Sequence, residues 1–189
     1  MIHSASLVAI LDACVLYSAP VRDLLLHLAD HHLYTPKWTD EIHREWTRNL
    51  RRKRPEISAE QLTRTVDAMQ DAFPDADVLG YEPLVKSIRL PDQNDAHVVA
   101  AAIRSRADVI ITANIRDFPN QYLKRFAIKA QHPDSFISML VANNPKSSVA
   151  AFKNQVANLQ NPPMSYMSVL EKLRNAGLVN TSEDLGKLI

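Results

Sequence analysis

Two short, mostly apolar runs, each followed closely by polar side chains, constrain the fold of this chain most. Leu7–Leu11 ends directly at Asp12, and Ala107–Thr112 is followed by Asn114 and Asp117. Runs of this kind are typical of strands that are buried on both faces of a parallel sheet. Because parallel strands end at the same edge of a sheet, the polar residues that follow them should open onto one crevice.

Helical patterns separate these runs. Helical spacing covers Val15–Leu28, Thr39 is a candidate N-cap for the next helix, and Ser58–Gln61 matches a capping box. Further helices are predicted from Asp95 to Arg106 and from Pro133 onward. Weaker strand candidates lie at Leu33–Thr35, Val78–Leu79, Val85–Ile88 and Phe126–Ala130. This alternation predicts an α/β fold with a mainly parallel sheet.

The predicted organisation changes at Asn143-Asn144-Pro145. Beyond this point come two or three short helices, interrupted at Asn161-Pro162-Pro163, and no evident strand. A length of 189 residues fits one ordinary domain with an appendage. We therefore expect an α/β domain over residues 1–145 and a helical C-terminal extension over residues 146–189.

Composition excludes several classes of protein. The formal net charge is +1, so any nucleic-acid-binding surface must be local. The single cysteine, Cys14, cannot form an intrachain disulfide, which suits a reducing compartment. The N-terminal run is too short for a signal peptide, and no segment is long and apolar enough for a membrane span, so we expect a cytoplasmic protein. With 3 glycines, the sequence contains no glycine-rich phosphate loop.

More carboxylates lie near the expected crevice. Asp95 is one turn before Val99 and shares its inward face, whereas Asp92 fits an N-cap or loop position. Glu41 and Glu45 lie one turn apart on the helix after Thr39. Each acid also has a structural alternative: a helix cap for Asp12, a turn for Asp117 and a solvated helix face for either glutamate. The matching strand-end positions of Asp12 and Asp117 favour a functional role.

Carboxylates that converge on one crevice repel one another by roughly 1–4 kcal/mol for each close pair. Either some of them take up a proton or a divalent cation neutralises them. An all-oxygen site with room for water suits Mg²⁺ or Mn²⁺. Such ions activate water and orient phosphodiesters, so the pattern points to hydrolytic phosphoryl transfer.

Basic, aromatic, histidine and cysteine side chains elsewhere in the sequence have more than one possible role. The basic run contains Arg44, Arg48, Arg51, Arg52, Lys53 and Arg54. This run either complements a helix C-terminus or binds RNA phosphates. Trp38 and Trp46 could stack on bases, but helical spacing with Ile42 favours core packing for Trp46. The histidines show no zinc-ligand spacing, His97 included, and Cys14 is interpreted as a buried small apolar residue.

Four segments, in this order, resemble the PIN-domain family, and within it the VapC-type toxins of bacterial toxin–antitoxin pairs. The segments are LDACVLYS, WTDEIHREWTRNL, LPDQNDAHVVAAAI and ADVIITANIRDFP. The resemblance covers about Leu7 to Leu140. One departure is Cys14, which stands where a small or polar residue is more usual. The helical tail is similar to the extension that a subset of these toxins carries.

The resemblance implies a three-layer α/β/α sandwich and a Mg²⁺- or Mn²⁺-dependent endoribonuclease. It assigns catalytic roles to Asp12, Glu45, Asp95 and Asp117, metal binding to Asp12, Asp95 and Asp117, and supporting roles to Thr112 and Asn114. Asp92 is a further candidate for a supporting role because it lies close to Asp95 in the sequence. For a nuclease, the basic residues Arg48, Arg51, Arg52 and Lys53 become candidates for RNA binding. Products with 5′-phosphate and 3′-hydroxyl ends, a cognate antitoxin protein and a homodimer are also implied.

Two other functions stay open at this point. One is a PIN-fold module that binds RNA or a protein partner without turnover, although clustered negative charge would not help such a module to bind phosphates. The other is a phosphatase with Asp12 as the nucleophile. The familiar pattern of such phosphatases needs a second Asp two residues on, where Cys14 stands, so this interpretation is weak.

Overall fold

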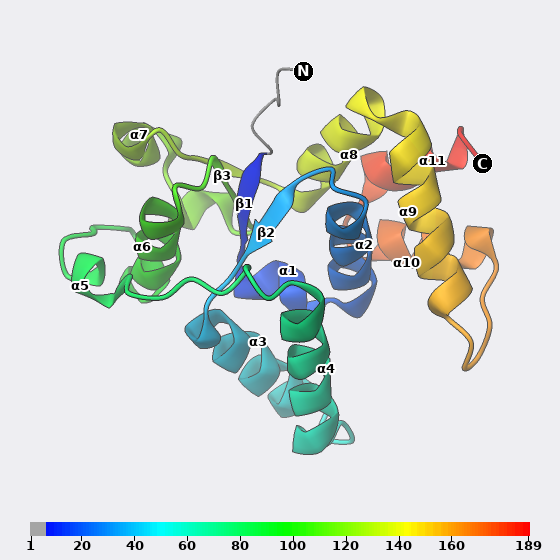
Figure 1. The fold of residues 1–189 in the computed structure, drawn as a ribbon, viewed down its shortest axis with the longest axis horizontal. Helices are drawn as coiled ribbons and strands as arrows, with labels where there is room; N and C mark the ends of the chain where they lie inside the picture. The colour runs from blue at the N-terminus through cyan, green and yellow to red at the C-terminus, as the bar shows by residue number, and fades with distance from the viewer. Residues whose placement is uncertain (1–6) are drawn as a thin grey trace.

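A four-stranded parallel sheet lies at the centre of the computed structural model, which describes residues 7–189 (Figure 1). The strand order is β2–β1–β3–β4. The strands are β1 (Val8–Leu11), β2 (Thr35–Lys37), β3 (Val109–Ile111) and β4 (Lys129–Gln131). The two central strands are the two apolar runs of the sequence, and all three residues of β3 are buried.

Helices cover both faces of the sheet (Figure 1). On one face lies α6 (Ala96–Ser105), which contacts β1 and β3; on the other lie α2 (Ala19–Asp30) and α8 (Pro133–Asn143). The shorter helices between the strands are α1 (Ala13–Tyr17), α5 (Glu82–Val85) and α7 (Asn120–Leu123), with 3₁₀ turns η1 (Gln93–Asp95), η2 (Ile115–Asp117) and η3 (Lys124–Phe126). This is the expected α/β/α sandwich of the PIN type.

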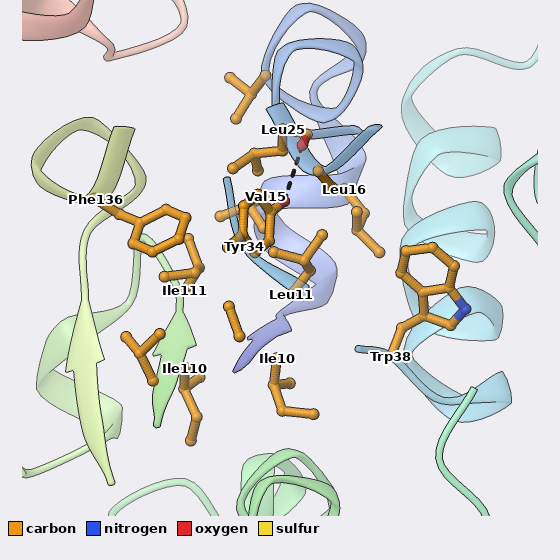
Figure 2. Packing of buried hydrophobic residues seen from close by; sticks show 14 of the residues in the cluster. Ile10, Leu11, Val15, Leu16, Leu25, Tyr34, Trp38, Ile110, Ile111 and Phe136 are labelled. Atoms are coloured by element: carbon orange, nitrogen blue, oxygen red, sulfur yellow. Dashed lines mark hydrogen bonds between the residues drawn. The ribbon is translucent and has the colours of Figure 1, made fainter. Parts of the chain in front are cut away.

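The core between the sheet and α2 and α8 is formed by large apolar side chains (Figure 2). The Tyr34 ring meets Phe136 of α8 edge to face, with ring centroids 5.1 Å apart. The Tyr34 hydroxyl donates a hydrogen bond of 3.0 Å to the Leu25 carbonyl of α2. Because a buried hydroxyl needs a partner, this bond fixes where β2 lies relative to α2.

A pair of helices, α3 (Asp40–Lys53) and α4 (Ala59–Ala72), extends beyond the carboxyl ends of the strands (Figure 1). Both predicted N-caps are confirmed: Thr39 accepts a hydrogen bond from the backbone N–H of Ile42, and Ser58 forms the capping box with Gln61. Trp46 is fully buried, as its spacing predicts, and Trp38 is fully buried as well. Neither indole is therefore available for stacking on a base.

Several predicted boundaries are wrong for identifiable reasons. The single helix over residues 15–28 is broken at Ser18 (φ −83°, ψ 108°), and Pro20 lies in the first turn of α2, where its missing N–H has no cost. The strand at Leu33–Thr35 is displaced to β2, which contains Pro36 and tolerates it because β2 is an edge strand. Asp95 belongs to η1 and not to the helix itself.

The weak strand candidates after α4 are also wrong. Asp77 forms an isolated bridge with Trp38, and residues 78–79 lie outside any strand. Val85 is the last residue of α5, and residues 86–88 lie outside any strand. A segment with a weak preference for strand becomes a strand only if it pairs with a neighbouring strand. Here the chain after α4 pairs with the segment that follows β2 only at the bridge between Trp38 and Asp77, so no further strand forms.

Three helices follow α8: α9 (Pro145–Asn158), α10 (Tyr166–Asn175) and α11 (Val179–Gly186). They confirm the helical character predicted for the C-terminal part, whereas its division from the rest at residue 146 stays a prediction. α9 packs on α2, and α11 packs on α8 (Figure 1). Between residues 7 and 189, no helix combines the length and the apolar character that crossing a membrane requires.

Asp134 joins α11 to α8. Its carboxylate accepts hydrogen bonds from the backbone N–H groups of Asn180 (3.0 Å) and Thr181 (2.8 Å) and from the Asn180 amide (2.9 Å), at the start of α11. Burial alone would raise the pKa of Asp134, but these donors outweigh burial and hold the pKa below its usual value. The side chains of Ser138 and Asp184 form a further hydrogen bond between the same helices.

We expect Asp134→Asn to lower the free energy of unfolding by about 1–3 kcal/mol, because an amide NH₂ would then face two N–H donors. The loss should appear in urea denaturation at pH 7. Because the folded pKa is depressed, the contribution of Asp134 is complete above about pH 4 and is lost as the pH falls through the folded value. The difference between the two proteins should therefore shrink in acid, and a constant difference at all pH values would contradict this assignment.

Candidate active site

Asp12 lies where the two central strands end. Its backbone N–H donates to the Ile111 carbonyl (3.1 Å), which extends the β1–β3 ladder by one residue. The Asp12 carboxylate accepts hydrogen bonds from the Ala13 N–H (2.7 Å) and from the Thr112 hydroxyl (2.7 Å). Asp12 therefore caps α1, which is the structural role that the sequence offered for this residue. Asp12 is also only 4% exposed, and burial raises its pKa. Capping a short helix does not require a buried carboxylate, so its burial points to a role beyond the cap.

The Cys14 thiol is part of the same hydrogen-bond network. It donates to Asp12 Oδ2 (3.1 Å), lies 3.4 Å from the Thr112 hydroxyl and accepts from the Ala113 N–H (3.3 Å). Burial, together with the negative charge of Asp12, raises the pKa of the thiol to about 12. The interpretation of Cys14 as a buried apolar residue is therefore wrong: it is half-buried and serves as a neutral hydrogen-bond donor to Asp12.

The predicted acids come together around Asp95. Burial, together with the negative charges of Asp12, Asp92, Glu45 and Asp117, raises the pKa of Asp95 to about 7. Asp12 lies between β1 and α1, Glu45 lies on α3, Asp95 ends η1 and Asp117 ends η2, so these side chains come from distant parts of the sequence. All four acids predicted to be catalytic therefore lie close enough for their charges to interact, with Asp92 nearby.

The structure distinguishes Glu45 from Glu41. Glu41 accepts a hydrogen bond of 3.0 Å from Arg44 and lies apart from the other acids, whereas Glu45 contributes to the charge that acts on both Asp12 and Asp95. Glu45 Oε2 also lies 3.5 Å from His97 Nε2. This geometry favours Glu45 as the site glutamate.

His97 is a neighbour of the site for which the sequence, without zinc-ligand spacing, favoured a purely structural role. It follows Asp95 by two residues, a spacing that would place the two side chains on opposite sides of one continuous helix. Because Asp95 belongs to η1, the first turn of α6 is free to direct His97 toward Glu45. His97 Nδ1 is buried and has no hydrogen-bond partner among residues 7–189.

The loop after β3 supports the site through its backbone. The Thr112 hydroxyl, which donates to Asp12, accepts a hydrogen bond from the Asn114 N–H (3.0 Å). The Asp117 N–H in turn donates to the Asn114 carbonyl (2.9 Å). Thr112 and Asn114 thereby connect the positions of Asp12 and Asp117.

Arg22 connects the helices that carry Asp12 and Glu45. Its guanidinium donates to the Leu16 carbonyl at the end of α1 (2.8 Å) and lies over the Trp46 ring of α3, 4.9 Å from the ring centroid. Burial lowers the pKa of Arg22, although the Asp23 carboxylate opposes this effect. A buried arginine at this junction restricts movement of α3 relative to α1.

The basic residues of α3 divide between two sides of the helix. Arg52 and Lys53 line a hollow of about 500 Å³ between α1 and α3, which Cys14 and Glu45 also line. Arg48 and Arg51 line a separate hollow toward the start of α4, which Arg52 also borders. Arg44 pairs with Asp40 and Glu41, and Arg54 pairs with Glu56.

The donor set fits a hard divalent cation in chemistry and charge. Carboxylate oxygens are the ligands that Mg²⁺ and Mn²⁺ prefer, and the mutual repulsion that acts on Asp95 is what a cation would relieve. Within residues 7–189, however, no three His, Cys, Asp or Glu side chains already have ligand spacing. Binding would therefore require the side chains to adjust.

Comparisons with known proteins agree with this architecture. Residues 8–116 match the family model described as PIN domain, and residues 133–187 match the one described as VapC50 C-terminal domain. The Mycobacterium tuberculosis (strain ATCC 25618 / H37Rv) protein named "Putative ribonuclease VapC50" is 36% identical over 94 residues, which are 50% of this chain and 55% of that protein. The chain thus spans about half the length of the curated relative that it matches. No solved structure gives a significant match.

At pH 8, above the raised pKa of Asp95, we expect Asp95→Asn to raise the free energy of unfolding in metal-free buffer by about 1 kcal/mol, because the substitution removes one charge from a repelling cluster. Added Mn²⁺ should raise the melting temperature of the wild type and have a smaller effect on the variant. Asp67→Asn, on the exposed surface of α4, is the matched control and should behave as the wild type. An Asp95→Asn protein that is no more stable than the wild type in EDTA would contradict the proposed repulsion.

Because the thiolate is the reactive form, the raised pKa of Cys14 predicts slow alkylation of the native protein. At pH 8, iodoacetamide should react at least about a hundredfold more slowly with the folded chain than with the urea-unfolded chain. The single cysteine makes mass spectrometry a direct readout. Asp12→Asn should speed the reaction of the folded chain, since it removes the negative charge beside the sulfur. Equal rates for the folded and unfolded wild type would exclude the neutral-donor role.

Proposed function

The chain belongs to the PIN-domain family, and on this premise we propose that it is a Mg²⁺- or Mn²⁺-dependent endoribonuclease, the toxin of a VapBC-type toxin–antitoxin pair. One observation carries the proposal: Asp12, Glu45 and Asp117 lie close enough to Asp95 for their negative charges to raise its pKa. The name of the M. tuberculosis relative supports RNA as the substrate.

In this proposal Asp12, Asp95 and Asp117 hold the cation. When bound, the cation would offset the negative charge of the crevice and promote attack of water on a phosphodiester. Glu45 would complete the site or orient the attacking water, and His97 would orient Glu45 from 3.5 Å away. Cleavage would break the bond between phosphorus and the 3′ oxygen, which takes up a proton, and leave 5′-phosphate and 3′-hydroxyl ends.

Thr112 and Cys14 would keep Asp12 in place. Both donate to Oδ2, while the Ala13 N–H donates to Oδ1. Three donors to a carboxylate that is only 4% exposed favour its ionised form, although burial opposes ionisation and dominates the pKa. A cation would shift the balance further toward the ionised state.

The alternative is a module that binds RNA without cleaving it. The crevice argues against this role, because a cluster of carboxylates repels phosphates unless a cation is present. RNA binding that persists after chelation, without any cleavage in Mg²⁺ or Mn²⁺, would favour the alternative.

The partners and the location of the protein follow from the same proposal. A VapB-type antitoxin would neutralise the toxin by blocking the acidic crevice. A homodimer and a cytoplasmic location also stay predictions. A gene for a small DNA-binding protein beside the gene for this chain would support the toxin–antitoxin assignment.

We expect the purified, antitoxin-free protein to cleave structured RNAs in Mg²⁺ or Mn²⁺ and not in EDTA. Asp12→Asn and Asp117→Asn should each lower the rate by at least about a hundredfold, because each removes a cation-binding carboxylate. Asp67→Asn should cleave as the wild type does. Gel electrophoresis with end-group analysis measures both the rate and the ends. Equal cleavage by the wild type and Asp12→Asn, or none by either, would refute the proposal.

A further inference from the structure

A hollow between α1 and α3 lies beside the acidic site, with Glu45 in its wall. Its volume is about 500 Å³, within the range of pockets that hold small ligands. The lining residues are Ala13, Cys14 and Tyr17 of α1, Glu45, Asn49, Arg52 and Lys53 of α3, and Asn114 of the loop after β3. Three of them, Cys14, Glu45 and Asn114, already belong to the site described above.

Helical periodicity explains why these residues share one wall. Glu45, Asn49 and Lys53 are spaced at i, i+4 and i+8, and Arg52 completes the row at i+7, so all four lie on one face of α3. The wall rises by about 12 Å from Glu45 to Lys53. Cys14 and Tyr17, at i and i+3, form the facing wall on α1.

The charge of the hollow changes sign along this length. At one end Glu45 adds to the negative charge around Asp12 and Asp95. The middle is neutral, with Asn49 and Tyr17, and the far end carries the cations Arg52 and Lys53. A strand with one phosphate at the carboxylates would therefore meet cations further along the same hollow.

The two cations at the far end are available to a ligand. Arg44 and Arg54, on the same segment, each pair with a carboxylate, whereas no ion pair with a carboxylate of residues 7–189 engages Arg52 or Lys53. Lys53 Nζ lies over the Tyr17 ring, 5.6 Å from its centroid. Favourable interaction with the C-terminus of α3 would account for cations here, but not for their placement at the end of a hollow beside an aromatic ring.

We propose that this hollow binds a nucleotide of a single-stranded RNA segment next to the phosphodiester that is cleaved. The inference rests on the proposed function above. Arg52 and Lys53 bind the phosphate of that nucleotide, and Tyr17 and Asn49 contact its base and ribose. The Tyr17 ring offers a stacking surface, and the Asn49 amide offers both a donor and an acceptor. A nucleotide can enter such a hollow only when it is unstacked, which selects single-stranded RNA.

The test is binding of a fluorescently labelled, mixed-sequence single-stranded RNA oligonucleotide, measured by anisotropy in EDTA, where cleavage does not interfere. The repulsion between the carboxylates and the RNA weakens binding in EDTA, but it is the same for the wild type and each variant, so the differences between them report on the hollow. Lys53→Gln removes one phosphate contact, so the slope of log affinity against log salt concentration should fall by about 0.7 in magnitude. Arg52→Gln should have a similar effect. Lys153→Gln, which removes an exposed cation of α9, is the matched control and should leave the slope unchanged.

A second pair of variants tests the aromatic contact. Tyr17→Leu should weaken binding of the single strand by roughly tenfold, whereas Tyr17→Phe, which keeps the ring, should bind as the wild type does. Circular dichroism checks that each variant is folded. The same RNA annealed to its complement should bind more weakly than the single strand, and Tyr17→Leu should not change that affinity.

The outcomes separate the two proposals. If the wild type cleaves RNA, but Lys53→Gln and Tyr17→Leu bind the single strand with unchanged slope and affinity, the assignment of the hollow is overturned and the proposed function stands. If the wild type neither binds nor cleaves RNA, both fall. The proposal that a nucleotide binds in the hollow is supported if Lys53→Gln lowers the slope of log affinity against log salt concentration and Tyr17→Leu weakens binding of the single strand.

Discussion

The hydrogen bond from the Thr112 hydroxyl to Asp12 is the contact on which the rest of the site depends. It joins the ends of the two central strands, and the ladder bond from the Asp12 N–H to the Ile111 carbonyl fixes the register beside it. The Asp12 carboxylate is thereby held in the interior, where Thr112, Cys14 and the Ala13 N–H donate hydrogen bonds to it. The protein keeps an ionisable side chain at this place although burial opposes ionisation of Asp12 and raises its pKa, which is typical of a functional site that departs from the rules of a stable core.

The remaining acids approach Asp12 because separate packing interactions position their helices. Ala100, Ala101 and Ala102 of α6 are fully buried, and such small side chains let the helix lie close to the sheet, with Asp95 at its beginning. The buried Trp46 and the guanidinium of Arg22 position α3, which carries Glu45. The apolar core thus supplies the free energy that opposes the repulsion among the carboxylates.

The C-terminal helices lie on the side of the sheet away from α6 (Figure 1). They pack on α2 and α8 through apolar contacts and through the Asp134 carboxylate at the start of α11. The family match for this part begins at residue 133, the first residue of α8, so α8 contacts the sheet and also belongs to the matched C-terminal unit. Such shared helices make the two parts of the chain structurally dependent on each other.

The sequence by itself determined what depends on short spacing: the two central strands, the caps at Thr39 and Ser58, and the position of Asp12 at a strand end. These features follow from apolar runs and local hydrogen bonds. Only the tertiary structure decided the break at Ser18, the helical state of residues 82–85, and the meeting of His97 with Glu45. The donation from Cys14 to Asp12 and the hollow lined by Tyr17 and Lys53 also needed the fold, because they depend on how helices separated in the sequence pack together. The acids that the sequence placed at two strand ends do lie close enough for their charges to interact, but the residues around them were set by packing that no local pattern records.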